Sequence, residues 1–140
     1  MNQSTEAASF SLKRVHWTTM YDHLRSVLPA EGCGLLAGVA ERSTAVYPVD
    51  NLLNSPTRFR MDPQQQAQAF IDLEGLGWDV LAIYHSHPEG PPHPSATDVA
   101  EFFYPDSYVL IWSPGPHGWD CRAYTIHDGV IHRAEYRIEE

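Results

Sequence analysis

The stretch YHSHPEGPPHPSATD (Tyr84–Asp98) holds three histidines and an aspartate within fifteen residues, interrupted by four prolines. The apolar run DVLAI precedes it and VAEFF follows it. Branched and aromatic residues before the stretch indicate a buried strand, and Ser95 three residues ahead of Asp98 is a pattern of helix starts. The sequence therefore predicts a strand, a stiffened loop and a short helix, whose polar side chains can meet at one site.

The two histidines at the start of this stretch lie on the same side of the predicted strand Asp79–Ser86. Side chains alternate across a strand, so His85 and His87, two residues apart, face the same way. Two such imidazoles can occupy neighbouring positions around a tetrahedral metal ion. The prolines that follow restrict the loop, which lowers the entropy lost when it brings a third ligand back.

The third ligand that the sequence offers is Asp98. If Ser95 caps a helix over residues 95–103, Asp98 stands one turn inside it, and its carboxylate can face the strand end. Two imidazoles and one carboxylate leave a fourth position for water, as in catalytic zinc sites, and zinc lowers the pKa of that water to about 7. The same donors do not exclude iron, manganese or cobalt.

A purely structural interpretation of the stretch is also available. The Ser-x-x-Asp pattern is a capping box, which has no catalytic content by itself. Histidines two residues apart occur without any metal. The combination of same-side histidines, a stiffened loop and an acid placed by a helix start favours a metal site. Capping and ligation are compatible, because one oxygen of Asp98 can serve each purpose.

The rest of the chain predicts alternating helices and strands. Apolar residues three or four apart predict a helix over Val15–Leu28, which Pro29 ends, and Asp62-Pro63 is a helix start. The order of elements predicts an α+β fold (an α/β sandwich), with a mixed sheet flanked by helices. We expect a flexible N-terminus over residues 1–10 and a single domain over residues 11–140. The remaining predicted elements are strands over Gly34–Ala40, Ser43–Val49 and Ser107–Ser113, a helix from Pro63 to about Leu73, and a C-terminal hairpin turning at Asp128-Gly129.

Composition and charge exclude several classes of protein. The chain has 9 basic and 18 acidic residues, a net charge of −9, whereas nucleic acids and anionic membranes attract basic surfaces. Its longest apolar runs, VLAIY and YVLIW, are too short to cross a bilayer, and the opening MNQSTEAASF has no signal-peptide core. Two cysteines, Cys33 and Cys121, make neither a disulfide framework nor a paired-CxxC zinc site, so a reducing, cytoplasmic location is predicted. Nothing in the sequence indicates an oligomeric state.

Three motifs together resemble one family. The pattern His85-x-His87-x(7)-Ser95-x-x-Asp98 is similar to the JAMM motif of the JAMM/MPN+ metallopeptidases, with no departure at a motif position. EGCGLLAG (Glu31–Gly38) resembles the first motif of that family, and NLLNSPTRFRMDPQQQAQAF resembles the linker and helix of its bacterial members. The resemblance covers about residues 31–112 and points to the compact prokaryotic type.

This resemblance implies a zinc-dependent (iso)peptidase that hydrolyses the bond after the C-terminal Gly-Gly of a ubiquitin-like or sulfur-carrier protein. It implies one zinc ion per chain, with His85, His87 and Asp98 as ligands. It also makes Glu31 the general base, and Ser95 the hydrogen-bond donor to the oxyanion. The plain alternatives are a solvated surface acid at Glu31 and a helix cap alone at Ser95.

Rival functions remain beside this one. A non-catalytic MPN scaffold would lack the metal ligands, all of which are present here. A zinc deaminase would need the H-x-E and P-C-x-x-C motifs, which are absent. Within the peptidase class, removal of a single amino acid such as cysteine from a sulfur-carrier C-terminus stays open. By analogy with the family, an extended substrate tail is expected to add as a strand near Asn54–Met61. Cys33 is expected to be buried and His93 exposed.

Overall fold

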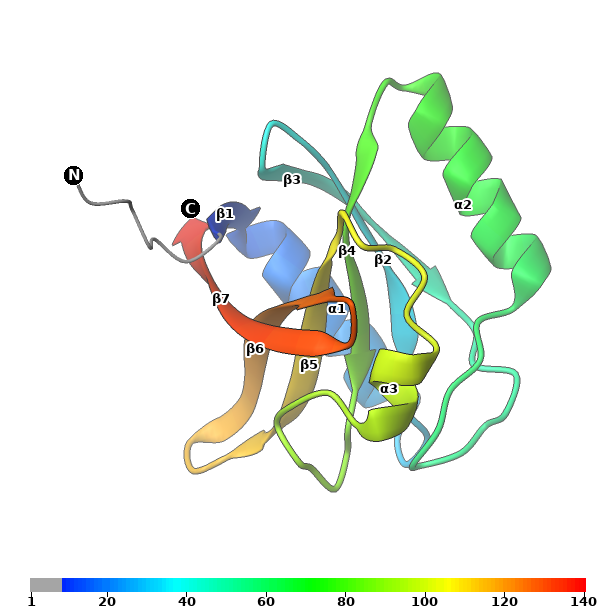
Figure 1. Cartoon of the computed structure of the whole chain (residues 1–140), viewed down its shortest axis with the longest axis vertical. Helices are drawn as coiled ribbons and strands as arrows, with labels where there is room; N and C mark the ends of the chain where they lie inside the picture. Colours follow the sequence, from blue (N-terminus) through cyan, green and yellow to red (C-terminus); the bar gives the residue numbers. More distant parts are fainter. Residues whose placement is uncertain (1–8) are drawn as a thin grey trace.

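Seven strands and three helices make up the described residues, 9–140, of the computed structural model (Figure 1). Their order confirms the predicted α+β class, with helices packed against a mixed sheet. None of the helices within these residues has the length and hydrophobicity needed to cross a membrane. In chain order the elements are β1 (Ser9–Lys13), α1 (Arg14–Ser26), β2 (Cys33–Val39), β3 (Arg42–Val49), α2 (Pro63–Gly75), β4 (Asp79–Ser86), α3 (Ala96–Ala100), β5 (Tyr108–Gly115), β6 (Gly118–His127) and β7 (Val130–Glu139).

The sheet closes on itself in the order β1-β3-β2-β4-β5-β6-β7. Strand β1 closes it, because it pairs in parallel with β7 along its whole length and with β3 through one register pair, Ser11 with Arg42. The central pair β4 and β5 is also parallel, while the remaining neighbours are antiparallel. Closure removes the unpaired edges that an open sheet would expose. The sequence predicted the mixed sheet but not its closure.

The predicted flexible N-terminus, residues 1–10, is wrong at its last two residues. Ser9 and Phe10 belong to β1, and residues 1–8 lie outside the described residues. The Phe10 side chain is 1% exposed, and its ring centroid lies 4.6 Å from that of Tyr108 and 5.6 Å from that of Tyr136. Burying an aromatic ring against two others stabilises the strand that carries it. Strand β1 therefore begins at Ser9, inside the segment predicted to be flexible.

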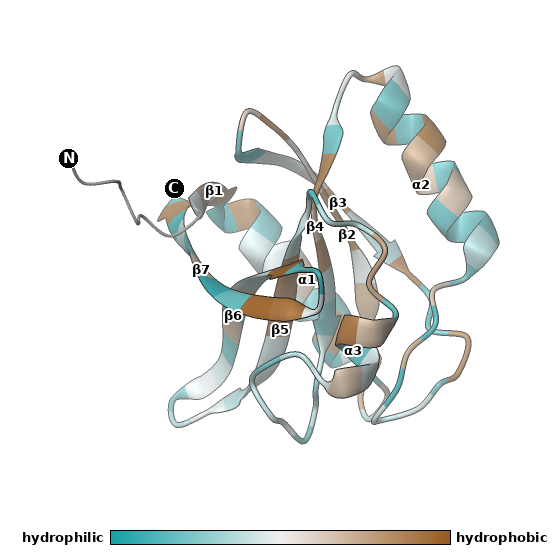
Figure 2. Cartoon of the chain, viewed as in Figure 1, coloured by the Kyte–Doolittle hydropathy of each residue, from teal (hydrophilic) through white to brown (hydrophobic). Residues whose placement is uncertain are grey.

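The hydrophobic core lies on both sides of the sheet. One cluster has buried side chains from six strands and from Met20 and Leu24 of α1, and Val46 of β3 packs against it, so it fills the inside of the closed sheet. On the outer side, α2 covers Leu35 and Ile83. In Figure 2, hydrophobic and hydrophilic residues alternate along α2. Because Ile83 and His85 stand two residues apart on β4, His85 faces this same outer side.

Local signals in the sequence set most element ends. Helix α2 begins as predicted, since the Asp62 side chain accepts hydrogen bonds from the amides of Gln64 and Gln65. The final hairpin turns at Asp128 and Gly129, whose φ angles of 53° and 77° suit the mirror-image turn that joins twisted strands. Helix α3 ends at Ala100 and is shorter than the predicted 95–103. Beyond the helix, Phe102 packs against two core clusters, one around Val109 and one around Leu35.

Candidate active site

The end of β4 brings the two histidines of the motif together. Their Nε2 atoms lie 3.2 Å apart, and both residues are buried. His85 pairs with Cys33 of β2 on one side and with Ile111 of β5 on the other. The amide of His87 donates to the Trp112 carbonyl at 2.8 Å. Both imidazoles therefore project from the same face, as predicted, and hydrogen-bonded strands fix their main chain.

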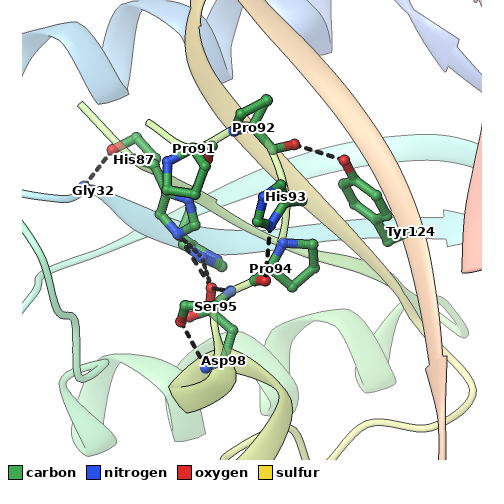
Figure 3. Close-up of polar contacts among 11 residues, drawn as sticks. Gly32, His87, Pro91, Pro92, His93, Pro94, Ser95, Asp98 and Tyr124 are labelled. Carbon is green, nitrogen blue, oxygen red and sulfur yellow. Dashed lines mark hydrogen bonds and ion pairs between the residues drawn. The ribbon is translucent and has the colours of Figure 1, made fainter. Parts of the chain in front are cut away.

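The proline-rich loop is held by bonds at its two middle prolines. The Nδ1 atom of His87 lies 2.8 Å from the Pro91 carbonyl oxygen, which can only accept, so Nδ1 carries the proton and donates it. This bond leaves Nε2 of His87 free for a metal ion. From β6, the Tyr124 hydroxyl donates to the Pro92 carbonyl at 2.6 Å (Figure 3). Sequence spacing gave no sign that Tyr124 supports the loop.

The loop returns Asp98 to the histidines. Its Oδ2 atom lies 3.2 Å from Nε2 of His85 and 3.1 Å from Nε2 of His87. The capping box is also formed: Oδ2 of Asp98 accepts from the Ser95 amide at 2.8 Å, and Oγ of Ser95 accepts from the Asp98 amide at 3.0 Å (Figure 3). The same oxygen therefore accepts the cap bond and faces both histidines, whereas the sequence suggested one oxygen for each purpose.

These three donor atoms fit a metal ion. The Nε2 atoms of His85 and His87 and Oδ2 of Asp98 form a triangle with sides of 3.2, 3.2 and 3.1 Å. Ligand atoms of a tetrahedral zinc site, with bonds of about 2.0–2.1 Å, lie about 3.3 Å from one another. An ion beside the centre of this triangle would therefore be at bonding distance from all three atoms.

The protonation states of the donors also suit a metal ion. Burial alone would raise the pKa of Asp98, but hydrogen bonds with His85 and His87 hold that pKa well below its usual range. Burial lowers the pKa of His85, so its ring is neutral. Burial also opposes the charged form of His87, yet the Asp98 carboxylate, the Pro91 carbonyl and Glu31 raise the pKa of His87. Metal ligands bind in their deprotonated forms, so the raised pKa of His87 means that a proton competes with a metal ion at this ring.

Glu31, directly before β2, completes the cluster. It is 3% exposed, and its carboxylate oxygen and the ring nitrogens of His85 and His87 all lie within 4.8 Å of one another. Burial raises the pKa of Glu31 to about 7, with the charge of His87 opposing this rise and the charge of Asp98 adding to it. The interpretation of Glu31 as a solvated surface acid is therefore wrong. A buried carboxyl group with a pKa near neutrality is suited to general acid–base chemistry.

Two neighbouring segments hold the main chain at Glu31. On one side, the Gly32 amide donates to Oγ of Ser86 at 2.9 Å, and the Ser86 amide donates to the Gly32 carbonyl at 3.1 Å. On the other side, the Glu31 amide donates to the Ser55 carbonyl at 2.7 Å, and Nδ2 of Asn51 donates to the Glu31 carbonyl at 3.0 Å. Ser86, Ser55 and Asn51 are residues that sequence reasoning did not single out.

The glycines of the EGCG segment allow close approach. A Cβ atom at Gly32 would lie 2.5 Å from the Leu24 side chain on α1, and one at Gly34 would lie 2.5 Å from the Tyr84 ring. Contacts this short require glycine at both positions, because Leu24 and Tyr84 are fully buried and have no room to shift. The two glycines therefore allow the main chain at Glu31 to pack closely against α1 and β4, beside the histidines.

A groove of about 690 Å³ adjoins the cluster. The segment expected as an edge for strand addition, Asn54–Met61, is not a strand. Its residues Arg58–Met61 line one wall together with Leu53, and the chain after α3 forms the other wall. Leu53 and Phe103 are exposed at this groove, and neither Arg58 nor Arg60 has an ion-pair partner within residues 9–140. Its lining includes His85 and Asp98 together with Leu53, Arg58, Phe59, Arg60, Met61, Ile83, Glu101, Phe102, Phe103 and Val109.

Sequence comparisons agree with this geometry. Residues 13–127 match the family described as prokaryotic homologs of the JAB domain. A CysO-cysteine peptidase from Mycobacterium tuberculosis is 35% identical over 124 residues, covering 86% of this chain and 85% of that protein. A probable TtuB-protein conjugate cleaving protease from Thermus thermophilus is 39% identical over 108 residues, covering 76% of this chain and 69% of that protein.

A solved structure has the same architecture. The solution structure of a protein from Desulfitobacterium hafniense matches with a TM-score of 0.83 and 35% identity. The match covers 94% of this chain and 93% of the other. The closed sheet, its helices and the loop that carries the motif therefore lie within a shared fold.

Proposed function

This chain belongs to the family of prokaryotic homologs of the JAB domain, and from that premise we propose that it is a zinc-dependent peptidase of the JAMM type. Its substrate would be a ubiquitin-like or sulfur-carrier protein, cut after the C-terminal Gly-Gly. The observation that carries the proposal is the triangle of His85, His87 and Asp98 donor atoms, with the buried carboxyl of Glu31 beside it. A scaffold that only binds partners has no use for such a cluster.

His85, His87 and Asp98 would hold one zinc ion per chain, because their donor atoms form one triangle. When bound, zinc supplies a Lewis acid that polarises a carbonyl group and lowers the pKa of water. The carbonyl of Pro91 keeps Nε2 of His87 directed at the site, and the Ser95 amide orients the Asp98 carboxylate. Partners of this kind fix ligand geometry.

Glu31 would move the proton. In its ionised form the carboxylate accepts a proton from the attacking water, and the resulting acid donates that proton to the leaving nitrogen. A pKa of about 7 makes both forms of Glu31 accessible at neutral pH. Because the side chain is buried, bulk water does not compete for the proton.

Ser95 would stabilise the substrate oxygen. Its Oγ atom accepts a hydrogen bond from the Asp98 amide, which leaves the hydroxyl hydrogen free to donate. A hydrogen bond aimed at the developing oxyanion stabilises the transition state more than the ground state. The helix cap and the oxyanion donor are therefore two roles of one side chain.

The groove would take the tail of the substrate. Glycine at the cut site lets the substrate backbone approach the donor atoms without a side chain in the way. The apolar surface of Phe59, Ile83 and Phe102 can cover an extended peptide, and the groove ends at His85 and Asp98. The two arginines on its wall, Arg58 and Arg60, favour a tail that carries carboxylates, and the net charge of −9 disfavours acidic partners elsewhere on the surface.

A second candidate reaction is removal of cysteine from a sulfur-carrier C-terminus. The observation that favours it is the 35% identity, over 86% of this chain, to a protein named CysO-cysteine peptidase. Both reactions hydrolyse an amide bond after Gly-Gly and differ only in the leaving amine.

The test is to incubate the zinc-loaded protein with two synthetic peptides that end in Gly-Gly, one joined to the α-amine of cysteine and one to a lysine ε-amine. Mass spectrometry is expected to show a free Gly-Gly terminus from at least one of them; two intact peptides would contradict the proposed function.

Cys33 is not expected to act as a nucleophile. The residue is fully buried, its thiol donates to the Val49 carbonyl at 3.5 Å, and burial raises the pKa of Cys33 to about 12. A thiol in that state is unreactive at neutral pH. We predict that Cys33→Ser keeps turnover within about threefold, and that thiol alkylation spares activity while zinc chelators abolish it. Inactivation by alkylation that Cys33→Ser prevents would point to cysteine chemistry.

Both cysteines are free and buried, which fits the cytoplasmic location that we propose.

A further inference from the structure

The side chain of Asn51, just after β3, uses its full hydrogen-bonding capacity. Its Nδ2 atom donates to the carbonyls of Glu31 and Arg58, both at 3.0 Å. Its Oδ1 atom accepts from the amides of Leu53 at 3.0 Å and Arg60 at 2.9 Å. A carboxamide has two donor hydrogens and two acceptor lone pairs, so no capacity remains.

The partners of Asn51 belong to two parts of the candidate active site. One part is the main chain of Glu31, and the other is the loop of residues 52–61, in which Leu53 and Arg58–Met61 line the groove. A second bond joins the same parts, from the Glu31 amide to the Ser55 carbonyl at 2.7 Å. The loop also reaches the donor cluster, since the Phe59 ring centroid lies 4.4 Å from that of His85. The wall of the groove is therefore attached to Glu31 and packed against His85.

We propose that Asn51 is a positioning residue that fixes the spacing between the groove loop and Glu31. The inference rests on the proposed function, in which the loop holds the substrate tail and Glu31 takes the proton. A tail bound along the loop then stands at a set distance from the Glu31 carboxylate. Rate depends steeply on such spacing, because a displacement of about 1 Å costs about 10²-fold. Asn51 acts through Glu31, because its four hydrogen bonds all go to main-chain atoms.

Asn51→Asp separates the tie to Glu31 from the folding of the loop. The carboxylate keeps an acceptor for the amides of Leu53 and Arg60, but it places an oxygen against the carbonyls of Glu31 and Arg58. The matched control is Asn54→Asp, which adds the same charge on the same loop at a residue that does not line the groove. Asn54 is exposed, and its side chain makes no hydrogen bond to the described part of the chain. Its positive φ of 47° is one that aspartate tolerates.

The first readout is steady-state kinetics of the zinc-loaded variants on the Gly-Gly peptide that native protein cuts. Asn51→Asp is expected to lower kcat by about 10- to 100-fold with KM changed less than about threefold, because the base is displaced while the groove wall persists. Zinc content is expected to match that of native protein, and Asn54→Asp to behave as native. Equal kcat for Asn51→Asp and Asn54→Asp would overturn the proposal.

The second readout needs no turnover. Hydrogen exchange of the Glu31 amide reports the junction with Ser55, and Asn51→Asp is expected to speed it by about tenfold or more. Amides of Leu110 and Ile111 in β5 serve as the control for global unfolding and are expected to keep their rates. A native exchange rate of the Glu31 amide in Asn51→Asp would overturn the proposal. This outcome can be measured even if the protein cuts neither peptide. If Asn51→Asp does not fold, Asn51→Ala is compared with Asn54→Ala, and faster exchange of the Glu31 amide in Asn51→Ala alone is expected.

Discussion

Replacing Glu31 with glutamine is expected to lower kcat by about 10²–10⁴-fold, the range that a general base contributes. Glutamine has nearly the same shape, but its amide does not accept a proton from water. The zinc content is expected to stay at the native value, because His85, His87 and Asp98 are unchanged. Turnover of the Gly-Gly peptides and metal analysis of the same samples measure the two quantities together.

Glu89→Gln is the matched control for this variant. Glu89 lies on the proline-rich loop and is exposed, and it does not line the groove. Neither an ion pair nor a side-chain hydrogen bond holds it among residues 9–140. Its replacement is expected to change kcat by less than about threefold.

Substrate affinity of Glu31→Gln is expected to persist, so the variant would retain a bound carrier protein. Loss of zinc would instead make Glu31 a ligand, and near-native turnover would mean that another group takes the proton.

The double variant His85→Ala, His87→Ala is expected to lose zinc binding and all measurable peptidase activity. It removes two of the three donor atoms whose separations of 3.1–3.2 Å fit a tetrahedral ion. His93→Ala is the control, because His93 is exposed on the same loop and is expected to leave metal content unchanged. Metal analysis after dialysis against less than one equivalent of zinc gives the readout. Full retention of zinc in the double variant would contradict the ligand assignment.

Local rules predicted much of this site. Alternation along a strand placed His85 and His87 on one face, and the capping pattern placed Asp98 within reach of them. The same kind of signal located the start of α2 at Asp62 and the turn at Asp128-Gly129. Each of these depends on residues close together in the chain, which is why the sequence alone was informative.

Local rules do not predict which distant segments of the chain pair with one another. Strand β1 pairs with β7, more than a hundred residues away, and nothing in SFSLK indicates that closure. The approach of Glu31 to the histidines depends on the register of β2 against β4, so only the family resemblance nominated Glu31. Asn51 carried no signal at all, because its four bonds go to main-chain atoms brought together by the folded loop.

One zinc ion, held by His85, His87 and Asp98, is expected to be required for peptide hydrolysis. The most direct measurement is turnover of the Gly-Gly peptide that native protein cuts, by metal-free protein titrated with zinc. We expect no cleavage without metal, a rise in rate with each addition of zinc, and a plateau at one zinc ion per chain. Cleavage by the metal-free protein at the rate of the zinc-loaded protein would contradict this expectation.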